Sequence, residues 1–115
     1  MTNHSQKTSL EWRWQKMPFV EQMANIGSEI SRAIHWRNKN KEKYSQNAFI
    51  RAHELISMTI DSVSTFPRLK ELTRLRETLN DYFYGNNEFS SSDIQWQKYF
   101  DHFNYAARII QNRKL

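Results

Sequence analysis

The sequence predicts an all-α protein that folds as an antiparallel up-down-up-down four-helix bundle. Glycine and proline are scarce, with 2 of each among 115 residues, whereas sandwiches and barrels need many tight turns. Four segments carry apolar residues at the 3–4 spacing of an amphipathic helix. The few helix breakers stand between those segments, at Pro18, Pro67 and Gly85. The length fits one domain.

The first predicted helix begins at Pro18, where a missing N–H costs nothing. Gly27 lies inside this helix, although glycine there costs about 1 kcal/mol relative to alanine. We therefore expect another helix to approach closely at Gly27. The apolar stripe of this segment is Phe19, Met23, Ile26, Ile30, Ala33 and Ile34.

Three further helices are predicted after a polar break. The second covers about residues 45–63, and the third begins at Pro67 and ends at Gly85, a good residue to follow a helix. A long loop over 85–92 precedes the fourth, which Ser92 or Asp93 can cap. The apolar stripe of the fourth helix includes Ile94, Trp96, Tyr99, Phe100, Phe103, Ala107 and Ile110. Four such helices with mostly short connections favour a bundle.

The N-terminal segment carries a different pattern. Residues 1–16 are polar and are predicted to form a flexible or loosely docked tail, while residues 17–115 form the bundle domain. Trp12 and Trp14 can pin the end of this tail, because exposed tryptophan is unusual. The segment has no apolar core of a signal peptide, and no apolar run approaches a membrane span of about 18 residues. We expect a cytoplasmic protein with no membrane partner.

The charge balance is basic. Seventeen Lys and Arg oppose 12 Asp and Glu, which gives a net charge of +5 and a pI near 9.6. This balance is compatible with an anionic partner such as nucleic acid. The absence of cysteine excludes disulfides, thiolate metal sites and cysteine nucleophiles.

No catalytic or metal-binding motif is visible, so we expect neither an enzyme nor a cofactor. Di-metal helical bundles use Glu-x-x-His, but the positions three before His35, His53 and His102 hold Arg32, Ile50 and Tyr99. HExxH and glycine-rich phosphate loops are absent. No histidine has an arginine four to six residues before it, the spacing of one class of helical ribonucleases.

A polar constellation lies beside the apolar stripes of the first two helices. Glu29 and Arg32 are three residues apart, as are Arg51 and Glu54, so each pair shares a helical face. One interpretation is a partly buried network that lines a groove. The alternative, which we favour, is a set of ion pairs that fix helix register.

Two basic clusters are candidates for binding nucleic acid. The first is Arg37, Lys39, Lys41 and Lys43, and the second is Arg68, Lys70, Arg74 and Arg76. In an antiparallel bundle they fall at opposite ends, which argues against one continuous phosphate track within a monomer. A solvated, functionless face remains the alternative.

Aromatic residues at the predicted helix ends allow three interpretations. The residues are Trp36, Tyr84, Phe89 and Trp96. They could stack the bases of a single strand, form a protein–protein hot spot, or close the ends of the core.

Several strings carry a resemblance to known proteins. They are IGSEI at 26–30, RAHEL at 51–55, LKEL at 69–72, RLRE at 74–77, DYF at 81–83 and KYF at 98–100. Together they resemble a group of small uncharacterised bacterial proteins. In length, helix count and charge the chain is also similar to the four-helix bundles encoded in ribosomal-RNA intervening sequences, and to the accessory (variability determinant) proteins of retroelements. That resemblance implies a ring-like homo-oligomer that binds nucleic acid.

The sequence therefore predicts a non-enzymatic accessory protein, homo-oligomeric, that binds RNA or single-stranded DNA through its basic clusters. The alternative is a protein–protein adaptor or oligomeric scaffold with no nucleic-acid role.

Overall fold

The computed structural model of the chain describes residues 8–113, which contain helices and no strand. The elements are α1 (Ser9–Lys16), α2 (Phe19–Asn38), α3 (Glu42–Ser62), α4 (Phe66–Tyr84) and α5 (Asp93–Arg113). The predicted all-α class is confirmed. Residues 1–7 of the predicted tail and residues 114–115 of the predicted domain lie outside the described range.

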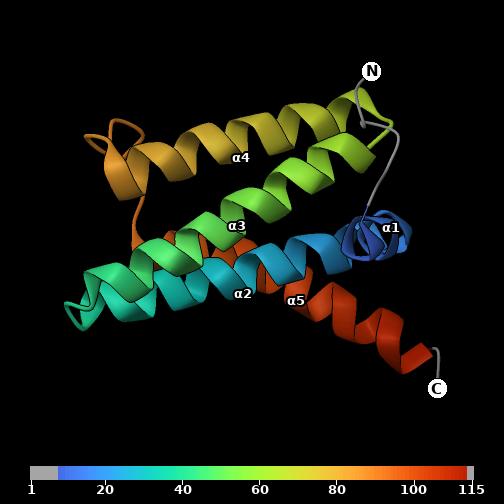
Figure 1. Cartoon of the computed structure of the whole chain (residues 1–115), viewed down its shortest axis with the longest axis horizontal. Helices are drawn as coiled ribbons and strands as arrows, with labels where there is room; N and C mark the ends of the chain where they lie inside the picture. Colours follow the sequence, from blue (N-terminus) through green and yellow to red (C-terminus); the bar gives the residue numbers. More distant parts are fainter. Residues whose placement is uncertain (1–7, 114–115) are drawn as a thin grey trace.

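The helices are organised around α2. Helix α3 packs antiparallel along one side of α2, and α5 crosses α2 on another side (Figure 1). Helix α4 packs on α3, and α1 also contacts α3. Helices α4 and α5 do not run side by side along their lengths, so this arrangement is more open than a closed up-down-up-down bundle.

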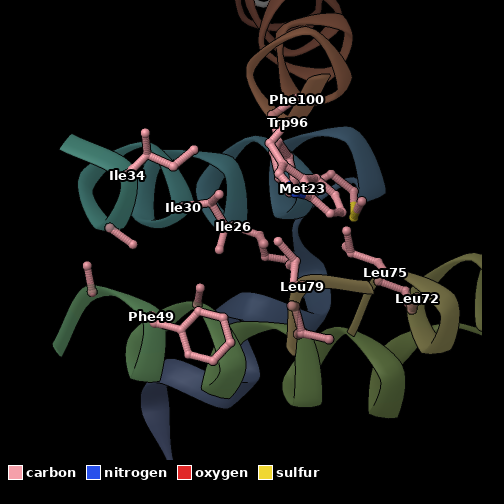
Figure 2. Close-up of a cluster of buried hydrophobic side chains, with 14 of the residues drawn as sticks. Met23, Ile26, Ile30, Ile34, Phe49, Leu72, Leu75, Leu79, Trp96 and Phe100 are labelled. Carbon is pink, nitrogen blue, oxygen red and sulfur yellow. The ribbon is translucent and has the colours of Figure 1, made fainter. Parts of the chain in front are cut away.

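The core is built from the apolar stripes. Figure 2 shows side chains of α2, α3, α4 and α5 converging on one cluster. Met23, Ile26 and Leu72 are each 0% exposed. Trp14 of α1 belongs to the same cluster, so all five helices contribute, and burial of these side chains is the main force that holds them together.

The crossing of α2 and α5 depends on Gly27. A Cβ built on Gly27 would lie 2.7 Å from Cβ and Cγ of Phe100, a separation shorter than van der Waals contact. Phe100 is itself 2% exposed. The close helix approach predicted at Gly27 is therefore confirmed, and the partner is α5.

Helix α1 is the element that sequence analysis did not predict. Residues 9–16 were assigned to the tail, but they form a helix whose first turn is closed by a capping box between Thr8 and Glu11. Trp14 is buried at 4% exposure. Its carbonyl accepts a 2.8 Å hydrogen bond from Nε2 of Gln22. At eight residues, α1 is too short for helical periodicity to be read with confidence from the sequence.

None of the described helices is long and apolar enough to cross a membrane.

Candidate functional site

Arg37 of the first basic cluster is a structural joint. Its Nη2 lies 2.9 Å from Oδ1 of Asp93. Its guanidinium carbon also lies 4.6 Å from the ring centroid of Tyr82 and 4.7 Å from that of Phe83. The side chain thus ties the end of α2 to α4 and to the start of α5. These contacts give Arg37 a role in holding the fold together.

Asp93 receives several donors at this joint. Asn38 donates from Nδ2 at 3.2 Å, and the Tyr82 hydroxyl donates to Oδ1. Burial acts to raise the pKa of Asp93, but the hydrogen bonds from Tyr82 and Asn38 and the charge of Arg37 outweigh it, so the pKa is lowered. Burial, then the hydrogen bond to Asp93, raises the pKa of Tyr82. The carboxylate is held ionised and the phenol protonated.

The other members of the first cluster are free of such contacts. Lys39, Lys41 and Lys43 are exposed around the turn between α2 and α3. This turn and the start of α4 lie at opposite ends of the molecule (Figure 1). The two basic clusters are therefore separated by the length of a helix.

The polar constellation on α2 and α3 centres on Glu29. Its Oε2 accepts a 2.8 Å hydrogen bond from Nε of Arg51, and its Oε1 pairs with Arg32. The Glu29 side chain is 11% exposed, against 58% for Arg32 and 53% for Arg51. Glu54 is exposed and forms no ion pair within the described chain. The arrangement joins α2 to α3.

The second basic cluster is divided between different faces of α4. The guanidinium carbon of Arg68 lies 4.6 Å from the ring centroid of Phe19, which links α4 to the start of α2. Arg76 is half-buried. Lys70 and Arg74 are exposed and border a groove between α4 and α5. The structure thus brings two cations of this cluster to one cavity.

The groove has a volume of about 530 Å³ and is lined by Pro67, Lys70, Glu71, Arg74, Leu75, Trp96 and Tyr99. Its α4 residues recur at three- and four-residue intervals, which places them on one face of that helix. The two aromatic residues come from successive turns of α5. The cavity exists because α5 turns toward α2 and leaves the facing side of α4 uncovered.

A hydrogen bond crosses the groove. The hydroxyl of Tyr99 donates to Oε2 of Glu71 at 2.7 Å. Burial, and then the hydrogen bond to Glu71, raises the pKa of the Tyr99 hydroxyl far above its usual value. The phenol therefore stays protonated and remains a donor. Its ring packs edge-on against Trp96, with the centroids 5.9 Å apart.

Trp96 forms a buried wall of the groove. It is 7% exposed, and its indole N–H finds no hydrogen-bond acceptor in the described part of the chain. Trp36 is half-buried and packs against Tyr44 with ring centroids 5.1 Å apart. These two tryptophans fit the interpretation in which aromatic side chains close the ends of the core. Of the four aromatics singled out in the sequence, Tyr84 and Phe89 are exposed, at 53% and 57%.

A second groove lies between α2 and α5. It is about 390 Å³ in volume and is lined by Ala24, Asn25, Ser28, Asn104, Ala107, Arg108 and Gln111. Its walls are amides and a hydroxyl with a single cation. Amide groups both donate and accept, so Arg108 is the one charged group that this groove offers a ligand.

No cluster of three or more metal-ligating side chains occurs among residues 8–113.

Comparison with known proteins finds no match: no protein family, no curated protein and no solved structure is similar to this chain. The geometry alone must therefore indicate the function.

Sequence reasoning identified Lys70 and Arg74 but did not place Glu71 or Tyr99 in a site. Sequence analysis gives Glu71 no role and places Tyr99 in the apolar stripe of the fourth helix. The two residues are 28 positions apart, and no local pattern relates them. One feature of the sequence points to Glu71: it stands between Lys70 and Arg74, two of the predicted nucleic-acid-binding residues. No comparable feature points to Tyr99.

Proposed function

We propose that this protein is a non-enzymatic accessory protein that binds single-stranded RNA or DNA at the groove between α4 and α5. The observation that supports this is the position of Lys70 and Arg74 on the border of a cavity walled by Trp96 and Tyr99. Cations beside aromatic and apolar surface are the combination that single strands require.

Each part of the groove has a task in this proposal. Lys70 and Arg74 contact phosphate oxygens, Lys70 as a point charge and Arg74 through its fork of donors. Pro67 and Leu75 offer apolar contact to a base. The volume of about 530 Å³ falls within the range of about 300–1,000 Å³ of small-ligand sites, so one nucleotide fits inside and the strand continues outside.

The remaining basic residues act at longer range. Lys39, Lys41 and Lys43 lie at the far end of the molecule, so in this proposal they attract the strand without touching the same nucleotide. Arg37 is engaged by Asp93, and Arg68 covers Phe19. The net charge of +5 favours encounter with any polyanion.

The test is fluorescence anisotropy with a labelled single strand of mixed sequence at about 50 and about 200 mM salt. The variant Lys70→Glu/Arg74→Glu is compared with Lys39→Glu/Lys41→Glu, which makes the same change in net charge. We expect the groove variant to lose at least about tenfold in affinity and to lower the salt slope by about two. The control should lose less. Equal losses in the two variants, or no binding by the unmodified protein, would refute the proposal.

A second candidate function, a protein adaptor or homo-oligomeric scaffold, is favoured by one observation. Exposed apolar side chains gather around the connection between α4 and α5, with Tyr84 53%, Phe89 57% and Ile94 63% exposed. Such residues suit a contact with another protein or another copy. Light scattering would distinguish the cases: a mass that falls on Phe89→Ser/Ile94→Ser supports self-association through this patch, and a monomer at every concentration excludes it.

A further inference from the structure

Glu71 is the feature of the groove that phosphate binding leaves unexplained. Its carboxylate lines the same cavity as Lys70 and Arg74, and it would repel a phosphate placed beside it. Neither cation forms an ion pair with it, although all three residues lie in the described part of the chain. The ionised Glu71 carboxylate can only accept hydrogen bonds, and it has acceptor sites that Tyr99 does not use. Beside two cations, it indicates a ligand that carries hydrogen-bond donors as well as negative charge.

We propose that the groove takes one guanine nucleotide of the bound strand, with the Glu71 carboxylate accepting hydrogen bonds from the N1–H and N2 amino groups of the base. This inference rests on the proposed nucleic-acid function and adds to it a preference among bases.

The donor pattern selects guanine among the standard bases. Guanine presents N1–H and the N2 amino group side by side on its Watson–Crick edge, and a carboxylate offers two oxygens to such a pair. Uracil presents one N–H between two carbonyl oxygens, which a carboxylate repels. Cytosine and adenine each present an amino group beside an acceptor nitrogen, so they supply one suitable donor.

The surroundings of Glu71 hold its carboxylate ready for this task. The Tyr99 hydroxyl donates to Oε2 at 2.7 Å and so fixes the orientation of the group. A carboxylate oxygen has two acceptor sites, so Oε2 can accept a second hydrogen bond, and Oε1 has no partner in the groove. The phenol remains a donor because burial and then the carboxylate raise its pKa.

The cations complete the recognition. Arg74 is three residues after Glu71 and shares its helical face, while Lys70 precedes it and borders the same cavity. The O6 oxygen of guanine lies next to N1–H and is an acceptor, which Arg and Lys bind readily. Because Lys and Arg each carry several N–H donors, one of these cations can donate to O6 as well as to a phosphate oxygen. Leu75 and Trp96 line the same cavity and offer apolar contact to the base.

The experiment compares four single strands that are identical uridine oligomers except for one central base, which is G, C, A or U. Anisotropy should give the G strand about tenfold higher affinity than the U strand, the size of one bidentate base contact. A fifth strand carries inosine, which keeps N1–H and lacks the N2 amino group. Its affinity should fall between those of the G and U strands.

Two variants of matched charge complete the test. In Glu71→Gln the side chain has one acceptor and one donor group, so the preference for G over U should fall to less than about twofold while affinity for the U strand holds or rises. Glu77→Gln makes the same charge change at an exposed carboxylate of α4 outside the groove, and should keep the preference. Urea unfolding of both variants establishes that each is folded.

The outcomes separate this inference from the function on which it rests. Equal affinity for all of the strands, or an unchanged preference in folded Glu71→Gln, refutes guanine recognition and leaves nucleic-acid binding in place. Failure of every strand to bind refutes both.

Discussion

The indole Nε1 of Trp14 lies 3.0 Å from Oγ1 of Thr59, and both side chains are buried. The hydrogen bond joins α1 to α3 across 45 positions of sequence. Thr59 in turn donates to the carbonyl of Leu55 at 2.7 Å, so its hydroxyl accepts from one helix and donates within the other. Because Thr59 is 0% exposed, water cannot replace either partner.

Thr59→Val should destabilise the protein by about 1–3 kcal/mol, because the buried indole N–H of Trp14 loses its acceptor. Trp14→Phe/Thr59→Val should cost less than the sum of the two single changes, since both partners of the bond are then absent. Urea unfolding measures all three. As a control, Trp12→Phe alters a side chain 52% exposed and should stay within about 0.5 kcal/mol of the parent. Additive single costs would show that the bond is not formed.

Gly27→Ala should destabilise the protein although alanine is the better helix former. Helix propensity alone favours the change by about 1 kcal/mol. The new methyl group, however, would lie 2.7 Å from atoms of Phe100, and overpacking of this kind costs about 1–3 kcal/mol. The net effect is then a destabilisation of up to about 2 kcal/mol. Ser31→Ala, on an exposed position of α2, should be neutral or stabilising.

A second substitution makes the Gly27 prediction sharper. Phe100→Ala removes Cγ and Cδ1, two of the three Phe100 atoms nearest the new methyl group, so Gly27→Ala should cost less in that background than in the parent. Thermal or urea unfolding of the double-mutant cycle gives the coupling energy. If Gly27→Ala stabilised the protein by the roughly 1 kcal/mol that helix propensity favours, the close approach of α5 to α2 at Gly27 would be contradicted.

Glu29→Gln should cost about 1–3 kcal/mol, the range for a charge-assisted hydrogen bond. The glutamine side chain is neutral and has a single acceptor oxygen, so it cannot form ion pairs with Arg32 and Arg51. The loss should stay below the roughly 3–5 kcal/mol of a fully buried ion pair, because the two guanidinium groups are more than half exposed and remain solvated. Glu54→Gln is the matched control and should change the unfolding free energy by less than about 0.5 kcal/mol. Equal effects of the two substitutions would place Glu54 in the network as well.

Much of the fold is predictable because its determinants are local. Apolar residues at helical spacing, the prolines at 18 and 67 and the glycine at 85 define the bounds of α2 to α4 within a few residues. Gly27 indicated a close helix contact for the same reason, since its cost within a helix needs compensation. Helix α1 was missed because its docking depends on Trp14 and a partner far along the chain.

The candidate site was less predictable because it depends on pairs of residues brought together by packing. Charge patterning identified Arg37, but its partner Asp93 is 56 positions away, so no local pattern shows that Arg37 also joins α2 to α5. The groove itself results from the direction of α5, which the hydrophobic pattern of that helix does not specify. The pattern predicts which face is buried and leaves open which helix covers it.

Asp93→Asn should destabilise the protein in a way that depends on pH. Burial acts to raise the pKa of Asp93, but Tyr82, Asn38 and Arg37 lower it below the ordinary value of 3.8. The folded state therefore favours the ionised form more than the unfolded state does, and this stabilisation is fully present above the ordinary pKa. It is lost as the pH falls through the lower pKa of the folded state.

At about pH 7, Asp93→Asn should cost about 1–3 kcal/mol, because the amide cannot serve as the anionic acceptor of the three donors. The other carboxyl groups titrate alike in both proteins, so the difference between variant and parent isolates Asp93. That difference should shrink as the pH falls below the ordinary value of 3.8 and through the lower pKa of folded Asp93, where the parent loses the same interaction. Asp101→Asn removes an exposed charge of α5 and should have little effect at about pH 7. Urea unfolding at several pH values measures the difference, and a constant gap down to the acid limit would mean that the Asp93 carboxylate does not hold the joint together as an anion.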